Sequence, residues 1–200
     1  MKKLIVVILI PLFVLSFVNE LSFSQSACNN IEQPKEEIKI NQEALKVSQI
    51  TGWDIEIAEY FTSEAKSKEV LIFEEALPII AVETGNRYDF NLIHYNDNNT
   101  CDYGVFQIND ITYDYIIKRF KSEGKEFDSW NKLNPNLNIS AGIFWIQYLK
   151  NEYNLSGNKL FTSYNKGVVG AKEYAKKYET YESGYSKKVK LEKMKLKEAI

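Results

Sequence analysis

The chain has 200 residues, of which 44% are hydrophobic and 26% are charged, a balance typical of a globular protein. The formal net charge of −2 is too weak for the basic surface that binds nucleic acid, so we expect no nucleic-acid partner. His94 is the single histidine of the sequence. A single histidine argues against metal sites built from several histidines, and it leaves only one possible base for a catalytic triad. We therefore expect no metal and no cofactor.

The N-terminus has the layout of a secretory signal peptide. Two lysines precede an apolar run from Leu4 to Val18, which is shorter than the roughly 18 or more apolar residues that usually span a membrane. We therefore predict a signal peptide over residues 1–24, with an uncleaved N-terminal anchor as the alternative, and a polar linker over residues 25–43. In either case we expect the domain of residues 44–200 to be exported and to lie outside the cytoplasm.

The two cysteines leave several states open. Cys28 follows the predicted signal peptide, whereas Cys101 lies far along the chain. Export permits a disulfide between them. Two cysteines alone do not establish one, because the sequence does not show whether they are close in space. We favour a free or weakly paired thiol over a disulfide or a lipid-modified Cys28.

The first part of the domain has helical periodicity. From about Ala44 to Ile80, apolar residues recur at spacings that fit amphipathic helices better than strands. Pro78 either kinks the helix that carries Glu83 or lies first in a new helix. Gly85 follows Glu83 by two residues and is a helix-stop signal.

The next segment changes in character. Residues 86–102 contain eight Asn and Asp residues, which is the composition of a loop or a short hairpin. The whole pattern predicts a mainly α fold with a small loop or β insertion near residues 86–110.

The last part of the chain again favours helices. Asn138 is a plausible N-cap for a helix whose apolar face reaches Leu149, and Asn158 for another that ends near Gly167. Further helices are expected over residues 168–178 and over the highly charged residues 187–199.

Glu83 is the first candidate for chemistry. It lies at the C-terminal end of an apolar helix, where the negative end of the helix dipole and the apolar surroundings both disfavour the charged carboxylate. Both effects raise the pKa of Glu83, as a general acid requires near neutral pH. The alternative is an ordinary last-turn glutamate on a solvated helix face.

Further polar motifs follow Glu83 at intervals along the chain. They combine glycines with amide and aromatic side chains, and any one of them alone is weak evidence. In chain order the motifs are Glu83-Thr84, Gly104-Val105-Phe106-Gln107, Asn138-Ile139 with Gly142, and Ser163-Tyr164-Asn165 with Gly167.

These four motifs, in this order, resemble those of the SLT-type lytic transglycosylases in the lysozyme-like superfamily. The stretch Asp102 to Asn109 is also similar to the Asp-Tyr-Gly-Ile-Phe-Gln-Ile-Asn signature of C-type lysozymes. The resemblance covers roughly residues 68–190 and implies a lysozyme-like fold. Thr84 stands where the transglycosylases usually have serine, and a serine usually found before the glycine motif has no clear counterpart here.

The resemblance implies cleavage of the bond from N-acetylmuramic acid to N-acetylglucosamine in peptidoglycan. Glu83 would protonate the glycosidic oxygen of this β-1,4 bond and then act as base on the 6-hydroxyl of the same sugar. The product would carry a 1,6-anhydro-N-acetylmuramic acid end.

The resemblance also implies a set of substrate-binding residues around Glu83. Amide and phenol groups would bond to sugar and N-acetyl groups, and aromatic rings would wall the cleft, with core packing as the favoured alternative for Phe106. The expected set is Gln107, Tyr164, Asn165, Thr84, Tyr103 and Phe106.

Asp102 separates two possible reactions. It occupies the motif position of the second carboxylate of C-type lysozymes, so a hydrolytic muramidase that uses Glu83 with Asp102 is an alternative. We favour a supporting role for Asp102 in a turn or at the start of a strand. A third alternative, from another class, is an inactive peptidoglycan-binding module.

The expected partner is the glycan strand of peptidoglycan in the cell wall. The membrane would be contacted only through the N-terminal segment. Local wall opening for a secretion or conjugation apparatus is one setting, and wall turnover and phage-related lysis are others.

Overall fold

The computed structural model describes residues 41–199, which form seven α-helices, one π-helical turn and a three-stranded sheet. The predicted signal peptide, residues 25–40 of the predicted linker and Cys28 lie outside the described residues. None of the described helices is long and apolar enough to cross a membrane. The elements are α1 (Gln42–Thr51), α2 (Ile55–Ser67), η1 (Ile72–Ala76), α3 (Leu77–Thr84), β1 (Ile93–Tyr95), β2 (Cys101–Tyr103), β3 (Ile108–Asn109), α4 (Asp110–Ser122), α5 (Pro135–Tyr153), α6 (Gly157–Tyr178) and α7 (Gly184–Glu198).

Helix α3 is short and almost entirely buried. Pro78 lies in its first turn, directly after the π-helical turn, where a residue without an N–H group costs little. Gly85 ends the helix in the left-handed conformation. Neither expectation for Pro78 is met in full: Pro78 is the second residue of α3, and α3 continues directly from the π-helical turn, with Ala76 already in the right-handed helical conformation. Glu83 lies in the last turn of α3.

The Asn-rich segment forms a small antiparallel sheet of order β1-β2-β3. His94 pairs with Asp102, and Asp102 pairs in turn with Asn109. Asn99 adopts a positive φ in the turn between β1 and β2, a conformation that asparagine tolerates better than most residues. The predicted insertion near residues 86–110 is confirmed as this sheet and its turns.

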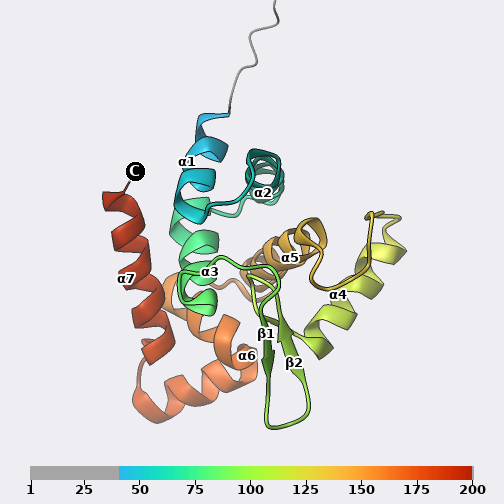
Figure 1. Ribbon diagram of the computed structural model, residues 1–200. Helices are drawn as coiled ribbons and strands as arrows, with labels where there is room; N and C mark the ends of the chain where they lie inside the picture. The colour runs from blue at the N-terminus through green and yellow to red at the C-terminus, as the bar shows by residue number, and fades with distance from the viewer. Residues whose placement is uncertain (1–40, 200) are drawn as a thin grey trace, which may run out of the picture. The chain divides into compact units, whose positions relative to one another are not determined.

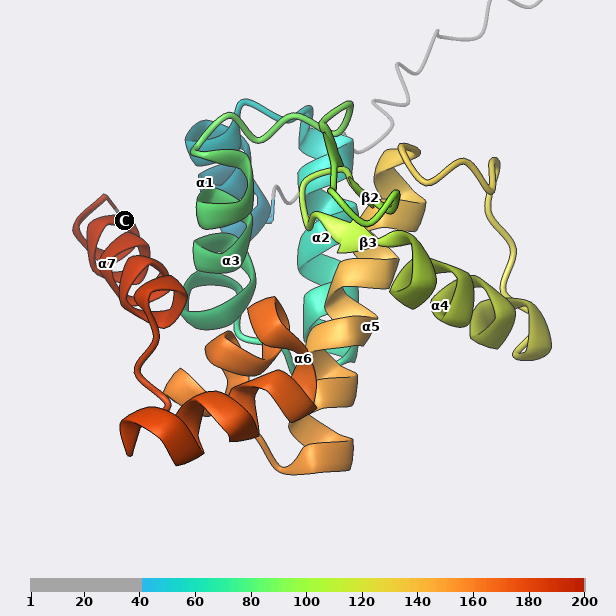
Figure 2. The same cartoon turned by 90° about the horizontal axis from the view of Figure 1, so that it is seen from below.

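Helix α5 lies at the centre of the helical part, in contact with α2, α4 and α6 (Figures 1 and 2). Its buried face includes Leu137, Ile139, Ile143 and Ile146, each fully shielded from solvent. Helix α7 packs along α3 on the other side of the domain (Figure 1). The predicted mainly α fold with a small sheet is confirmed.

Asn138 is not the N-cap of α5, contrary to the sequence expectation. The helix begins one turn earlier, at Pro135, and the side chain of Asn134 caps it by accepting a hydrogen bond from the Leu137 N–H. The reason is that proline is well suited to the first helical position and asparagine to the position before it. Asn138 therefore lies inside the helix, fully buried.

The buried Asn138 amide fastens the turn after β2 to α5. Its Oδ1 accepts hydrogen bonds from the backbone N–H groups of Val105 and Phe106, at 3.1 and 3.4 Å. Its Nδ2 donates to the Tyr103 carbonyl at 3.1 Å. Gly104 lies against this amide with φ +66°, and a Cβ there would collide with the Asn138 side chain. One side chain thus satisfies the polar backbone of a turn that is packed into the core.

We predict that Asn138→Ala lowers the free energy of unfolding by about 3 kcal/mol, because it leaves buried backbone groups without partners. Chemical denaturation measures the change. Asn136→Ala is the matched control, since Asn136 lies one residue after Pro135 and is only partly buried. Equal stability of the two variants would contradict this role of the Asn138 amide.

Candidate functional site

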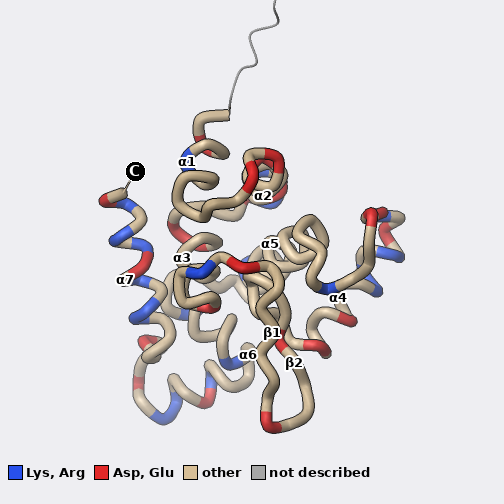
Figure 3. The backbone as a smooth tube through the Cα atoms, in the orientation of Figure 1, with Lys and Arg blue, Asp and Glu red and all other residues tan. Residues whose placement is uncertain are grey.

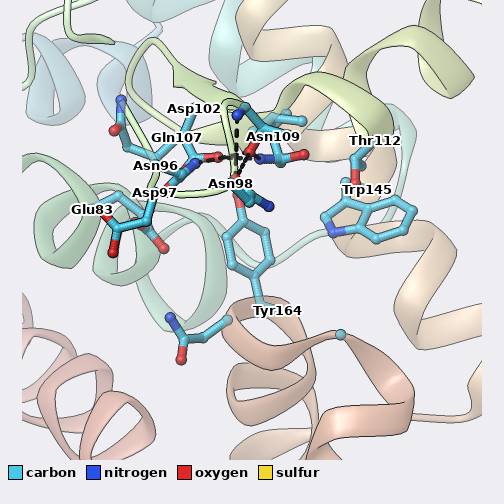
Figure 4. Close-up of a pocket in the computed structure, with 14 residues that line it drawn as sticks. Glu83, Asn96, Asp97, Asn98, Asp102, Gln107, Asn109, Thr112, Trp145 and Tyr164 are labelled. Carbon is cyan, nitrogen blue, oxygen red and sulfur yellow. Dashed lines mark hydrogen bonds between the residues drawn. The ribbon is translucent and has the colours of Figure 1, made fainter. Parts of the chain in front are cut away.

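A pocket of about 510 Å³ lies between the sheet and the helices α3, α5 and α6 (Figure 4). Five residues selected from the sequence line it together: Glu83, Asp102, Gln107, Tyr164 and Asn165. They come from positions as far apart as α3 and α6. The remaining lining residues are Asn96, Asp97, Asn98, Thr100, Ile108, Asn109, Thr112, Trp145 and Gly167.

Glu83 combines burial with access to the pocket. Its carboxylate Oε1 accepts a hydrogen bond of 2.6 Å from the Tyr185 hydroxyl. Burial raises the pKa of Glu83 to about 7, the Tyr185 hydrogen bond lowers it, and the nearby charge of Asp102 raises it. At neutral pH the carboxyl group is therefore divided between its protonated and ionised forms, as proton donation followed by proton uptake requires.

Tyr185 is a site residue that the sequence did not reveal. It lies 102 residues after Glu83, in the first turn of α7. The sequence pattern predicts a helix only from residue 187, whereas α7 begins at Gly184, so Tyr185 fell outside the expected element. Burial and the charge of Glu83 hold the pKa of Tyr185 well above its usual range, which keeps its hydroxyl a proton donor.

Asp102 lies on the central strand of the sheet and is held there by Asn109. The Asn109 Nδ2 donates to Asp102 Oδ1 at 2.8 Å and to Thr100 Oγ1 at 2.7 Å (Figure 4). Asn109 also caps α4 through its side-chain oxygen. The carboxylate of Asp102 is therefore fixed in orientation on one wall of the pocket, close enough to Glu83 to influence its pKa.

Gln107 presents a defined atom to the pocket. Its Nε2 donates to the backbone carbonyls of Gly104 and Leu92, at 2.7 and 3.2 Å. Both partners are acceptors, which determines which end of the amide is nitrogen. The side-chain oxygen is then the group that Gln107 can offer to a ligand, and it would accept a hydrogen bond from a hydroxyl or an N-acetyl N–H group.

Tyr164 and Asn165 bring α6 to the pocket. The Tyr164 hydroxyl donates to the Phe106 carbonyl at 2.7 Å, so its hydrogen bond goes to the turn after β2 and not to Glu83. The ring of Tyr164 lines the pocket (Figure 4), and the Asn165 amide is exposed there. Gly167, with φ +68°, interrupts the helical backbone of α6 as the sequence predicts.

Three of the expected substrate-binding residues lie outside the lining of the pocket. Thr84 is fully buried, and its hydroxyl donates to the Ile80 carbonyl. Phe106 is also fully buried, against Gly142, where any Cβ would collide with its ring. Tyr103 packs edge-to-face on Tyr113 at 6.3 Å. These side chains support the walls from behind, and for Phe106 the core-packing alternative is the one observed.

The electrostatics of the pocket disfavour an anionic ligand. Glu83, Asp97 and Asp102 contribute carboxylates, whereas Lys and Arg are absent from the lining residues. Basic residues gather instead on α6 and α7 (Figure 3), where residues 157–199 contain eleven lysines and five glutamates. Phosphate groups would be repelled from the pocket. Within residues 41–199, no group of three His, Cys, Asp or Glu side chains is placed to hold a metal ion.

The comparisons with known proteins agree with the resemblance seen in the sequence. Residues 61–187 match the family described as the transglycosylase SLT domain. No curated protein and no solved structure matches the chain. The matched span runs from α2 into α7 and includes Glu83, Tyr185 and every residue that lines the pocket. Because the match covers more than half of the chain and the whole of the pocket, this protein belongs to the transglycosylase SLT domain family.

Proposed function

We propose that this protein is a lytic transglycosylase that cleaves peptidoglycan glycan strands, with Glu83 as general acid and base. Membership in the SLT family supports peptidoglycan lytic transglycosylase activity in general terms. The observation that carries the assignment to Glu83 is its position: a carboxyl group with a pKa of about 7, half-buried in the wall of a polar pocket and oriented by the Tyr185 hydroxyl.

The first step is protonation of the glycosidic oxygen by Glu83. The proton passes from the carboxyl group to the oxygen that leaves with N-acetylglucosamine, and the bond from that oxygen to C1 of N-acetylmuramic acid breaks. The charge that develops on the sugar ring is positive, so the carboxylates of Glu83 and Asp102 stabilise it. Gln107 and Asn165 hold the sugar and N-acetyl groups in place.

The second step closes the anhydro ring. Glu83, now ionised, takes the proton from the 6-hydroxyl of the same N-acetylmuramic acid, and the oxygen of that hydroxyl bonds to C1. Glu83 is thereby protonated again and no water is consumed. A pKa near 7 suits both steps, because the same group must give a proton and then recover one.

Hydrolysis with Asp102 is the second candidate function. Asp102 lines the same pocket, and its charge acts on the pKa of Glu83, which is the observation that favours it. In the proposed reaction Asp102 is an electrostatic partner, whereas in a retaining hydrolase it would be the nucleophile. A peptidoglycan-binding module without activity is less consistent with the site, because binding alone has no use for a buried acid whose pKa is raised.

We also propose that the protein acts in the exported, cell-wall compartment, where its substrate lies. The signal peptide or anchor over residues 1–24 and any association with a secretion or conjugation apparatus stay predictions from the sequence.

We predict that Glu83→Gln lowers kcat on purified glycan strands by about 10²–10⁴-fold, because glutamine cannot transfer the proton. Release of soluble fragments measures the rate. Glu173→Gln, at an exposed position on α6, is the matched control, and circular dichroism of both variants checks the fold. Unchanged release by the Glu83 variant would contradict the assignment.

Product analysis separates the two reactions. We expect mass spectrometry of the wild-type digest to show 1,6-anhydro ends, and Asp102→Asn to keep those ends while kcat falls by less than about 10²-fold, since the lost charge is only supportive. Reducing ends, with activity abolished in Asp102→Asn, would establish the hydrolase instead.

The pH profile tests the link between Tyr185 and Glu83. The acid must be protonated, so kcat/KM falls about tenfold for each pH unit above the pKa of about 7. The Tyr185 hydrogen bond lowers the pKa of Glu83, and Tyr185→Phe should therefore raise it and shift the basic limb of the profile to higher pH. A profile that is unchanged or shifted to lower pH would contradict this role of the hydroxyl.

A further inference from the structure

A row of aromatic rings leads out of the pocket along α5. Trp145 lines the pocket at the end away from Glu83 (Figure 4). The Trp145 ring stacks on Tyr148, one turn further along α5, with centroids 5.3 Å apart and planes only 14° from parallel. The Trp145 and Tyr148 rings therefore cover each other's faces, and the aromatic surface continues from the pocket edge along α5.

Two more tyrosines extend this row at the surface. Tyr115 of α4 and Tyr153 at the end of α5 each lie 5.9 Å from Tyr148 between ring centroids. They remain 42% and 44% exposed, respectively, which is high for such large rings. We name these four residues, Trp145, Tyr148, Tyr115 and Tyr153, the aromatic strip.

The strip adjoins the pocket on both α4 and α5 and packs against core residues. Tyr115 follows the pocket residue Thr112 by three positions, and Tyr148 follows Trp145 by three, a spacing that places residues on the same face of a helix. Beneath the strip, Phe144 stacks on Tyr148 at 6.1 Å and meets the buried Phe120 edge-on at 5.4 Å. The exposed rings therefore have a rigid base.

We propose that the aromatic strip binds the part of the glycan strand that extends beyond the pocket, an inference that rests on the proposed function. A polymer bound in the pocket extends beyond it, and Trp145 lies at one end of the pocket. The C–H face of a sugar ring is apolar and stacks on flat aromatic rings, while tyrosine hydroxyls can bond to sugar hydroxyls. The sugar rings themselves are uncharged, which suits stacking on aromatic rings.

The local charges do not favour another class of partner. Near the strip, α4 carries both signs of charge: Asp114 and Glu123 alternate with Lys118, Arg119 and Lys121, and Arg119 is paired with Glu123 at 2.6 Å. Lysines gather on α6 and α7 instead (Figure 3), which is where an anionic partner would be attracted. Binding of the glycan strand on the aromatic strip implies that the enzyme prefers long strands over short fragments, because only long strands reach the strip.

The test measures binding of long glycan strands and of a tetrasaccharide to proteins that carry Glu83→Gln, so that cleavage does not interfere. Adding Tyr115→Ala or Tyr153→Ala should weaken binding of long strands by about two- to tenfold for each ring, the range for aromatic stacking. Binding of the tetrasaccharide should not change. Tyr115→Trp should restore the affinity, and Tyr178→Ala is the control, since Tyr178 is 53% exposed on α6 and also pairs with another ring.

The outcomes separate this inference from the proposed function. Long strands bound equally well by the Tyr115, Tyr153 and Tyr178 variants would overturn the role of the strip, even if the wild type cleaves them normally. The same holds if the alanine variants change only the oligomeric state in sedimentation experiments, because the strip would then be a contact between protein chains. A wild type that neither binds nor cleaves glycan strands would instead remove the proposed function itself.

Discussion

The buried side chain of Asn138 is the constraint on which the pocket depends. Its amide forms hydrogen bonds with the backbone of the turn after β2, and this allows the polar backbone groups of that turn to pack against the central helix α5. The same turn carries Phe106, whose carbonyl accepts the hydrogen bond that holds Tyr164 of α6 in place. The sheet, α5 and α6 are thus joined through one short segment, and the pocket forms where they meet.

The position of Glu83 lowers the stability of the fold. Burying a carboxyl group disfavours its ionised form, and a fully apolar residue would suit the interior of α3 better. The hydroxyl of Tyr185 offsets part of that cost and also orients the carboxyl group. Helix α7, which sequence alone suggests only as a charged tail, therefore completes the site by packing along α3.

The walls of the pocket match a neutral, hydroxyl-rich polymer. Amide groups and carboxylates supply acceptors, Trp145 and Tyr164 supply flat surfaces, and the lysines are placed on α6 and α7, outside the lining. The aromatic strip carries the same chemistry beyond the pocket. In the proposed function, recognition by ring faces and hydrogen bonds is separated from proton transfer at Glu83, which requires a single carboxyl group in partly desolvated surroundings.

Local signals were sufficient for much of the fold: apolar periodicity for the helices, Asn and Asp for the hairpin, and glycines for the ends at Gly85 and Gly167. They also selected Glu83, Gln107 and Asn165, which belong to short motifs and which the structure brings together in one pocket. Local signals failed for Asn138, Tyr185 and Thr84, whose roles depend on neighbours distant in the sequence. A buried amide, a phenol 102 residues from its partner and a hydroxyl turned into the core cannot be distinguished from surface groups until the helices are packed, because only packing decides which polar groups lose contact with water and must find partners in the protein.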